Sequence, residues 1–272
     1  MQSFICEEQL IVSFFPILSG PNCIGRTTLH NFPPNNWEEI SKSPCLVNLT
    51  WAHDGVWHSL SLDELPFGSS LSVNRRDIDQ FMPEHALPLL SLSTTIYPKV
   101  SGSLPIFKLG CNTPAWRATL ELVSPFTSTG YQGELDPFPV TGSLLAFPPF
   151  IQFGDGIENY MLLLNLEENP QPRATKVSIY KSCQPSDRCG LFEVQSNSVS
   201  VINLDGLFEP DDLPAVACQN MSGIPLFFSK TNDGSFLSLE HTHPPASMTI
   251  HGKRWETQKL LKQYWFKKLG CK

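Results

Sequence analysis

The sequence predicts a mainly β protein, an antiparallel β-sandwich-like fold or an open barrel, followed by a C-terminal amphipathic α-helix. Short apolar or alternating runs recur along the chain, and several of them start about ten residues apart, a spacing typical of such folds. The chain also has 24 prolines and 18 phenylalanines, with only 17% charged residues, a composition that suits short strands joined by proline-bearing loops. Because 41% of its 272 residues are apolar, it can bury a substantial core.

The strands are expected in two series, each strand bounded by Gly, Pro, Asn or Asp. The first series opens with a hairpin, 45–51 and 56–60, around a turn at His53, Asp54 and Gly55. Its other members are 94–97, 104–109, 115–123, 129–135, 143–147 and 159–166. The second series comprises 174–181, 191–194, 198–204, 215–218, 224–229 and 235–241. In 115–123, the alternation of Ala118, Leu120 and Leu122 with polar residues predicts one core-facing side.

A second hairpin is expected from 224–229 and 235–241. The connecting residues include Asn232, Asp233 and Gly234, which tolerate the left-handed backbone that a tight connection needs. The alternation then places Leu239 and His241 on one face of the strand and Glu240 on the other.

The chain divides into three expected parts. Residues 1–44 form an irregular, proline-rich segment packed on the body, with a short helix at 36–41. Residues 45–250 form one β-rich domain, with a candidate sub-boundary at 167–172 and a helical turn at 77–81. Residues 251–272 form a basic helix at 253–269, in which Leu261, Trp265 and Leu269 repeat every four residues.

Charge and hydropathy exclude some functions. The net charge is −7, yet residues 251–272 hold seven basic residues and one acidic residue, so this end carries +6 and the remainder −13. A general nucleic-acid surface is not expected, because most of the chain lacks clustered Lys and Arg. No apolar run is long enough to span a membrane and no export signal is evident, so we expect a soluble, cytoplasmic protein whose eight cysteines are reduced.

Three histidines near the C-terminus suggest a metal site. His241 and His243 share one face of a strand, and His251 follows closely, so these imidazoles can hold Zn or non-haem Fe with a carboxylate from elsewhere. The alternative is that the histidines pack at a sheet edge and donate hydrogen bonds to loop carbonyls.

Aromatic and polar residues gather in loops at strand ends between residues 131 and 155. This mixture is typical of sites for small or glycan-like ligands, although core phenylalanines separated by prolines have the same composition. The aromatic members are Tyr131, Phe138, Phe147, Phe150 and Phe153, and the candidate ligand-binding residues are Tyr131, Gln132, Glu134, Gln152 and Asp155.

Common catalytic signatures are missing from the sequence. There is no Gly-x-Ser-x-Gly elbow and no phosphate-binding glycine loop. The neighbours His53 and Asp54 are better explained by a turn than by acid–base catalysis, and Cys183 and Cys189 by a turn with two unrelated thiols.

We therefore expect a non-enzymatic binding or accessory protein with a loop-formed site for a small-molecule or carbohydrate ligand. One alternative is a metal-dependent enzyme centred on His241 and His243. Another is a structural component of a larger assembly, docked on a protein partner through the C-terminal helix. If that helix instead completes the core, its removal will destabilise the protein.

Overall fold

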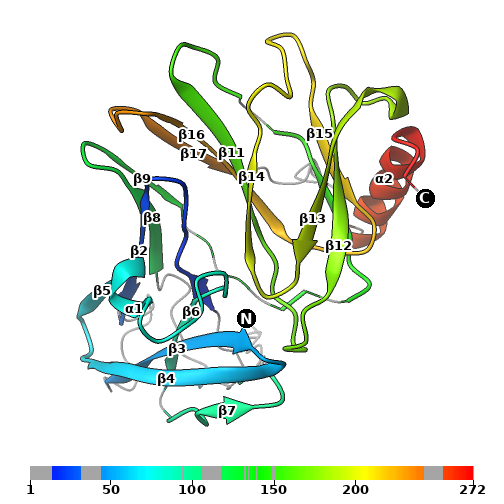
Figure 1. Cartoon of the computed structure of the whole chain (residues 1–272). Helices are drawn as coiled ribbons and strands as arrows, with labels where there is room; N and C mark the ends of the chain where they lie inside the picture. Colours follow the sequence, from blue (N-terminus) through cyan, green and yellow to red (C-terminus); the bar gives the residue numbers. More distant parts are fainter. Residues whose placement is uncertain are drawn as a thin grey trace, which may run out of the picture. The chain divides into compact units, whose positions relative to one another are not determined.

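The computed structural model describes residues 14–31, 44–93, 95–105, 118–131, 133, 135, 137, 138, 140–148, 151–241 and 254–271. Their strands form four antiparallel sheets, and a helix ends the chain (Figure 1). The expectation of a mainly β, antiparallel fold with a C-terminal helix is confirmed. The single sandwich or open barrel expected from the sequence does not account for these strands, because the described residues form four separate sheets. Four is the number of sheets in a four-bladed β-propeller.

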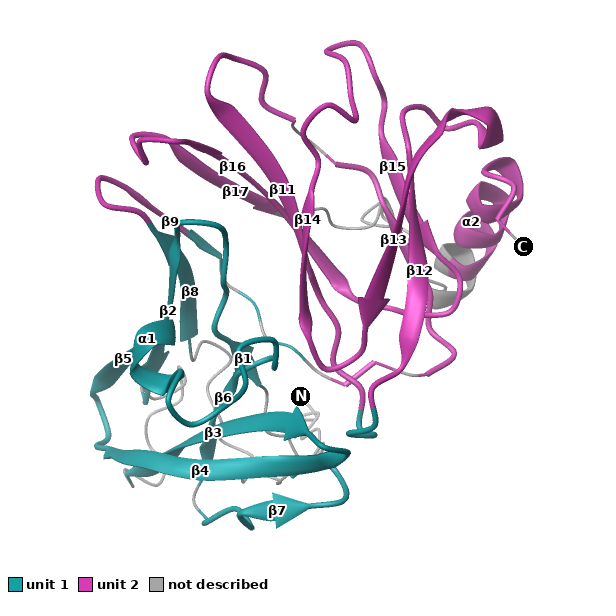
Figure 2. Ribbon diagram, viewed as in Figure 1, with its two compact units in different colours: residues 1–123, 130–136, 168–171 teal, residues 124–129, 137–167, 172–272 magenta. Residues whose placement is uncertain are grey.

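The chain divides into two compact units (Figure 2). Unit 1 contains residues 1–123, 130–136 and 168–171, and unit 2 contains residues 124–129, 137–167 and 172–272. The segment 168–171 of unit 1 falls at the sub-boundary considered from the sequence, 167–172.

The first sheet of unit 1 has the strand order β1-β6-β3-β4-β7. Its strands are β1 (Phe15–Pro16), β6 (Leu89–Ser93), β3 (Cys45–His53), β4 (Val56–Leu65) and β7 (Val100–Ser101). The hairpin expected at 45–60 is confirmed, because β3 and β4 pair antiparallel with Trp51 opposite His58. Its turn places Asp54 at φ 50° and Gly55 at φ 73°, the left-handed region that Asp and Gly tolerate better than most residues.

The other sheet has the order β5-β2-β8-β9. Its strands are β5 (Ser70–Asn74), β2 (Ile24–His30), β8 (Ala118–Val123) and β9 (Ser128–Tyr131). The expected alternation is confirmed in the described part of 115–123, where Ala118, Leu120 and Leu122 are buried. The helical turn expected at 77–81 begins earlier, as α1 (Arg75–Ile78), because Asn74 and Asp77 form a capping box at its start. The helix expected at 36–41 lies outside the described residues.

Unit 2 contains two four-stranded sheets that share one core. The first consists of β10 (Leu144–Ala146), β15 (Ala215–Cys218), β12 (Ala174–Tyr180) and β13 (Arg188–Gln195), in that order. The second consists of β14 (Val199–Asn203), β11 (Ile157–Leu164), β16 (Ile224–Thr231) and β17 (Leu237–His241). Val177 and Val216 of the first sheet meet Met161, Ile202 and Phe227 of the second in the same buried cluster. This core holds unit 2 together by removing apolar surface from water.

The hairpin expected at 224–241 is confirmed. β16 and β17 pair antiparallel, with Leu226 opposite His241 and Phe228 opposite Leu239. Gly234 adopts φ 74° in the turn, and its amide donates to the Thr231 carbonyl at 3.0 Å. Local turn chemistry therefore determines where this hairpin reverses.

Helix α2 (Arg254–Lys268) covers the outer face of the β10-β15-β12-β13 sheet. Its Phe266 and the following Leu269 are buried against Leu145, Ala215 and Ala217. In β15, Val216 and Cys218 belong instead to the core between the sheets, so this strand is buried on both faces. That double burial explains why 215–218 is a continuous apolar run. The helix expected at 253–269 is confirmed.

Candidate functional site

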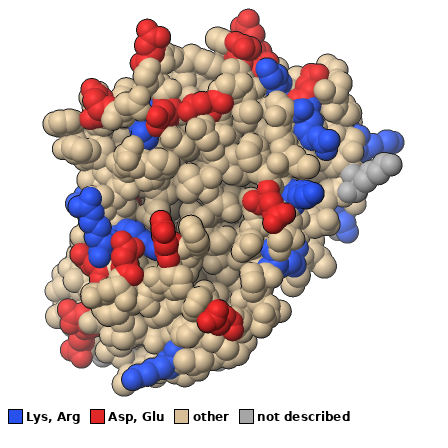
Figure 3. All heavy atoms as spheres, in the orientation of Figure 1, with Lys and Arg blue, Asp and Glu red and all other residues tan. Residues whose placement is uncertain are grey.

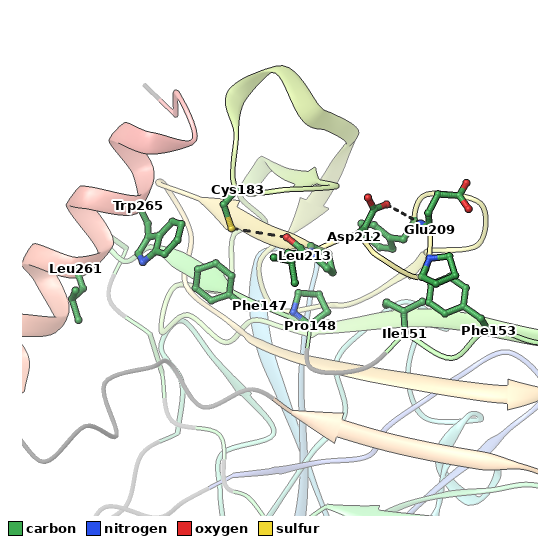
Figure 4. A pocket seen from close by; sticks show the side chains of 13 residues that line it. Phe147, Pro148, Ile151, Phe153, Cys183, Glu209, Asp212, Leu213, Leu261 and Trp265 are labelled. Atoms are coloured by element: carbon green, nitrogen blue, oxygen red, sulfur yellow. Dashed lines mark hydrogen bonds between the residues drawn. The ribbon is translucent and has the colours of Figure 1, made fainter.

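A cavity of about 680 Å³ lies in unit 2 beside helix α2. Four segments surround it: the helix, the residues after β10, the loop after β12 and the connection between β14 and β15 (Figure 4). Its largest apolar lining side chains are Phe147, Ile151, Phe153, Phe208, Leu213, Leu261 and Trp265. A hollow with this lining is chemically suited to apolar groups, because such groups leave water when they enter it.

An aromatic pair forms the wall next to the helix. The rings of Phe147 and Trp265 meet edge to face, with centroids 5.0 Å apart and an interplanar angle of 65°. Phe147 and Pro148 directly follow the end of β10, where proline cannot donate to a strand ladder. The Lys268 ammonium lies 4.6 Å from the centroid of the Trp265 ring. Contacts with two neighbouring residues thus hold Trp265 in place at the cavity.

Two carboxylates lie at another edge of the cavity, in the connection 205–214 (Figure 4). The backbone amide of Glu209 donates to Asp212 Oδ2 at 2.8 Å, and the amide of Asp212 donates to the Glu209 carbonyl at 3.0 Å. This small turn orients Asp212, while the Glu209 side chain is exposed. The pair supplies acceptors and negative charge to an otherwise apolar site.

Cys183 adds a polarizable group to the lining. Its Sγ donates weakly to the Leu213 carbonyl at 3.9 Å, which links the loop after β12 to the connection before β15. Burial raises the pKa of the Cys183 thiol. The side chain is therefore a neutral thiol near pH 7 and a poor nucleophile there.

The residues expected to bind a ligand are only partly described. Tyr131 lies at the end of β9 in unit 1, whereas Gln152 and Asp155 lie in unit 2, and Gln132 and Glu134 lie outside the described residues. The side chain of Asn159 bonds both the amide and the carbonyl of Gln152, at 3.0 Å each. This clamp positions the segment that carries two lining residues of the cavity, Ile151 and Phe153.

Sequence reasoning identified some of the lining and missed the rest. Phe147 and Phe153 belong to the expected aromatic group, and both line the cavity. Trp265 was assigned only to a helix face, and Phe208 and Glu209 were not singled out. One local signal was available, since the connection reads Glu-Pro-Asp-Asp-Leu-Pro at 209–214, an acidic loop with two prolines in which a large apolar side chain, Leu213, is largely exposed.

The proposed metal ligands cannot be assembled from the described residues. His241 ends β17, and the side chains of His241, His243 and His251 lie outside the described part of the chain. Within the described part, no group of three His, Cys, Asp or Glu side chains is suited to a metal ion. The metal site remains a prediction, which elemental analysis of the purified full-length chain can test.

The two other residue pairs considered from the sequence are visible. His53 Nε2 lies 3.2 Å from Asp54 Oδ2, but both side chains are exposed, and such surface contacts contribute little to stability. Cys183 and Cys189 remain thiols, and the Sγ of Cys189 donates to the Ile179 carbonyl at 3.6 Å. Neither pair forms a recognisable reaction centre.

The chain matches no protein-family model, no curated protein and no solved structure.

On the face drawn in Figure 3, basic and acidic side chains are interspersed among uncharged ones. Among the described helices, none combines the length and the apolar composition needed to cross a membrane.

Proposed function

We propose that this protein is a binding protein whose unit 2 takes up a small ligand with an apolar body and a hydrogen-bond donor. The observation that carries the proposal is the cavity beside α2, with aromatic walls and two carboxylates at its edge. Its volume of about 680 Å³ is within the range of small-molecule sites, roughly 300–1,000 Å³.

The lining favours an apolar body. The rings of Phe147, Phe208 and Trp265 offer contact surface to a flat or branched hydrocarbon group. A glycan-like ligand, the other expectation from the sequence, carries hydroxyl groups around its whole ring. Each hydroxyl that leaves water without a partner costs free energy, and the cavity wall offers few polar partners.

The edge of the cavity favours a donor group at one end of the ligand. Glu209 and Asp212 accept hydrogen bonds and carry negative charge, so an ammonium or hydroxyl group suits this edge. The neutral thiol of Cys183 tolerates an apolar neighbour. Binding rather than reaction is what such a set of side chains supports.

A fluorescent apolar probe, N-phenyl-1-naphthylamine, tests the apolar part of the proposal. We expect saturable binding to the full-length chain, weakened about three- to tenfold by Phe153→Ala because the substitution removes part of the cavity wall. Phe126→Ala is the matched control, since Phe126 is 77% exposed and does not line the cavity. Equal affinities of the two variants would refute the site.

A second pair of probes tests the donor part. Two naphthyl compounds of equal size, one neutral and one with an alkylammonium group, are titrated into the same protein. We expect the ammonium compound to bind several-fold better, and Glu209→Gln with Asp212→Asn to remove that preference. Asp211→Asn is the control, because Asp211 lies in the same loop but does not line the cavity. A preference that survives the double substitution would contradict this assignment.

A further inference from the structure

A second hollow, also of about 680 Å³, lies along a different face of helix α2. The helix contributes Lys259, Lys262, Gln263, Phe266 and Lys267 to its lining. These positions are three, four, seven and eight residues apart, so they share one helix face. Across the hollow lie Ser143, Gln219 and Ser222, from the residues before β10 and the connection between β15 and β16.

The charged side chains among the described residues that line this hollow are all basic. Its lining contains three ammonium groups, and no carboxylate side chain is among the described lining residues. This lining differs from that of the neighbouring cavity, which is mostly apolar and has two carboxylates. The other polar groups in the lysine-lined hollow are hydroxyls and amides. Amide and hydroxyl groups that can donate, next to ammonium groups, are suited to an oxyanion.

Lys262 is the least solvated of the three lysines. Its Nζ donates to the Ser143 carbonyl at 2.7 Å, and burial lowers the pKa of this ammonium group. The carbonyl oxygen satisfies one donor but does not neutralise the charge. An anion in the hollow would supply the missing counter-charge and favour the protonated form.

Hydrogen bonds connect the wall opposite the helix, formed by Ser143, Gln219 and Ser222, to α2 and to the residues that follow it. The Nε2 of Gln219 donates to the Cys271 carbonyl at 2.9 Å, and the Nζ of Lys262 donates to the Ser143 carbonyl. The hollow is therefore formed by segments that already contact each other within unit 2, and a ligand would enter a largely assembled site.

We propose that this hollow binds a phosphate-bearing small molecule. The three lysines supply the charge for a phosphate monoester or a diphosphate, and the side-chain amides of Gln219 and Gln263 supply further N–H donors. A single phosphate group displaces the volume of only a few waters, each about 30 Å³ in the liquid, so the hollow also has room for a second phosphate or an organic body.

Titration calorimetry of the full-length chain with inorganic pyrophosphate tests the proposal. We expect saturable one-to-one binding that weakens as sodium chloride is added, because salt screens the ammonium groups. Replacing Lys259→Gln and Lys267→Gln together should weaken binding about tenfold or more. Absence of saturable binding would overturn the proposal.

A matched pair of substitutions separates a local site from general charge. Lys176→Gln with Lys268→Gln removes the same number of positive charges from unit 2, but neither residue lines the hollow. This control should change pyrophosphate affinity less than about twofold, because screened charges outside the site contribute little. Equal losses in the two double variants would show nonspecific attraction and refute the site.

Two further measurements identify the source of the phosphate and the independence of the site. Binding to phosphatidate vesicles without binding to pyrophosphate would show that α2 recognises a lipid surface, and would overturn the small-molecule proposal. Phe153→Ala, which alters only the apolar cavity, should leave pyrophosphate affinity unchanged. A large loss in that variant would show that the phosphate does not bind in the lysine-lined hollow.

Discussion

Lys230 is a cation buried in unit 2, with only 2% of its surface exposed. It lies on β16 opposite Glu158 on β11, and its Nζ is 2.5 Å from Glu158 Oε2. The hydroxyl of Tyr160 donates to the same carboxylate oxygen at 2.8 Å, and the Tyr160 ring centroid lies 5.9 Å from the ammonium. The carboxylate thus compensates a charge that water cannot reach.

Removing this carboxylate is expected to destabilise the protein. Glu158→Gln leaves the Lys230 ammonium buried without a counter-charge, and we expect a loss of about 2–3 kcal/mol, below the value for a fully buried pair because Glu158 is partly exposed. Glu193→Gln, at an exposed position on β13, is the control and should change stability by less than about 0.5 kcal/mol. Urea unfolding measures both, and equal midpoints would contradict the prediction.

The same ion pair predicts a pH dependence. Hydrogen bonds from Lys230 and then Tyr160 hold the pKa of Glu158 below its ordinary value of 4.5. The stabilisation is therefore complete above that ordinary value and is lost as the pH falls through the lower, folded-state pKa. Wild type and Glu158→Gln should differ in unfolding free energy at pH 7 and converge below pH 4.5. A gap that stays constant in acid would exclude this origin.

Cys183 provides a chemical readout of the apolar cavity. Because burial raises its pKa, iodoacetamide should modify it slowly near pH 8 and faster as the pH rises further. Peptide mapping by mass spectrometry follows this one residue among the eight cysteines. N-phenyl-1-naphthylamine should slow the reaction by covering the thiol, and an unchanged rate at saturating probe would argue against binding beside Cys183.

At the scale of elements, the sequence located both hairpins and the C-terminal helix but misplaced the short helix α1. Both expected hairpins form, because Asp54, Gly55 and Gly234 satisfy a backbone need within a few residues of chain. The helical turn at 77–81 was misplaced, since its start depends on the mutual contact of Asn74 and Asp77 rather than on apolar spacing.

Helix α2 is expected to act as part of the core of unit 2. Phe266 is 7% exposed, and Phe266→Ala should cost about 3 kcal/mol by leaving a cavity against Leu145 and Ala217. Leu260→Ala is the control on the same helix, because Leu260 is 65% exposed and should cost less than about 0.5 kcal/mol. Thermal and urea unfolding report both changes.

Loss of the whole helix should cost more. Deleting residues 253–272 uncovers the outer face of β10 and β15, including Leu145, Ala215 and Ala217. We expect a lower melting temperature and exposure of apolar surface to a dye. A truncated chain that melts like the full chain would instead favour docking of the helix on a partner.

At the scale of the whole molecule, unit 2 has a hydrophobic core built from its own residues. One buried cluster lies between the two sheets of unit 2, and another lies between α2 and the sheet that it covers. Both consist of residues between 144 and 271. We therefore expect residues 137–272, expressed alone, to unfold in one cooperative urea transition. Well-dispersed amide NMR signals are the second measurement. A collapsed, non-cooperative chain would show that the core of unit 2 needs residues 1–136, which include its own segment 124–129.

The sequence by itself determined the β class, both hairpins and the C-terminal helix, because period-two alternation, turn residues and helical spacing act over a few neighbouring residues. It also indicated Phe147 and Phe153. The tertiary structure decided the number of sheets, the double burial of β15 and the meeting of Phe208, Glu209 and Trp265 around one cavity. Those features join segments more than fifty residues apart, and such pairings depend on packing and chain entropy that no local pattern records.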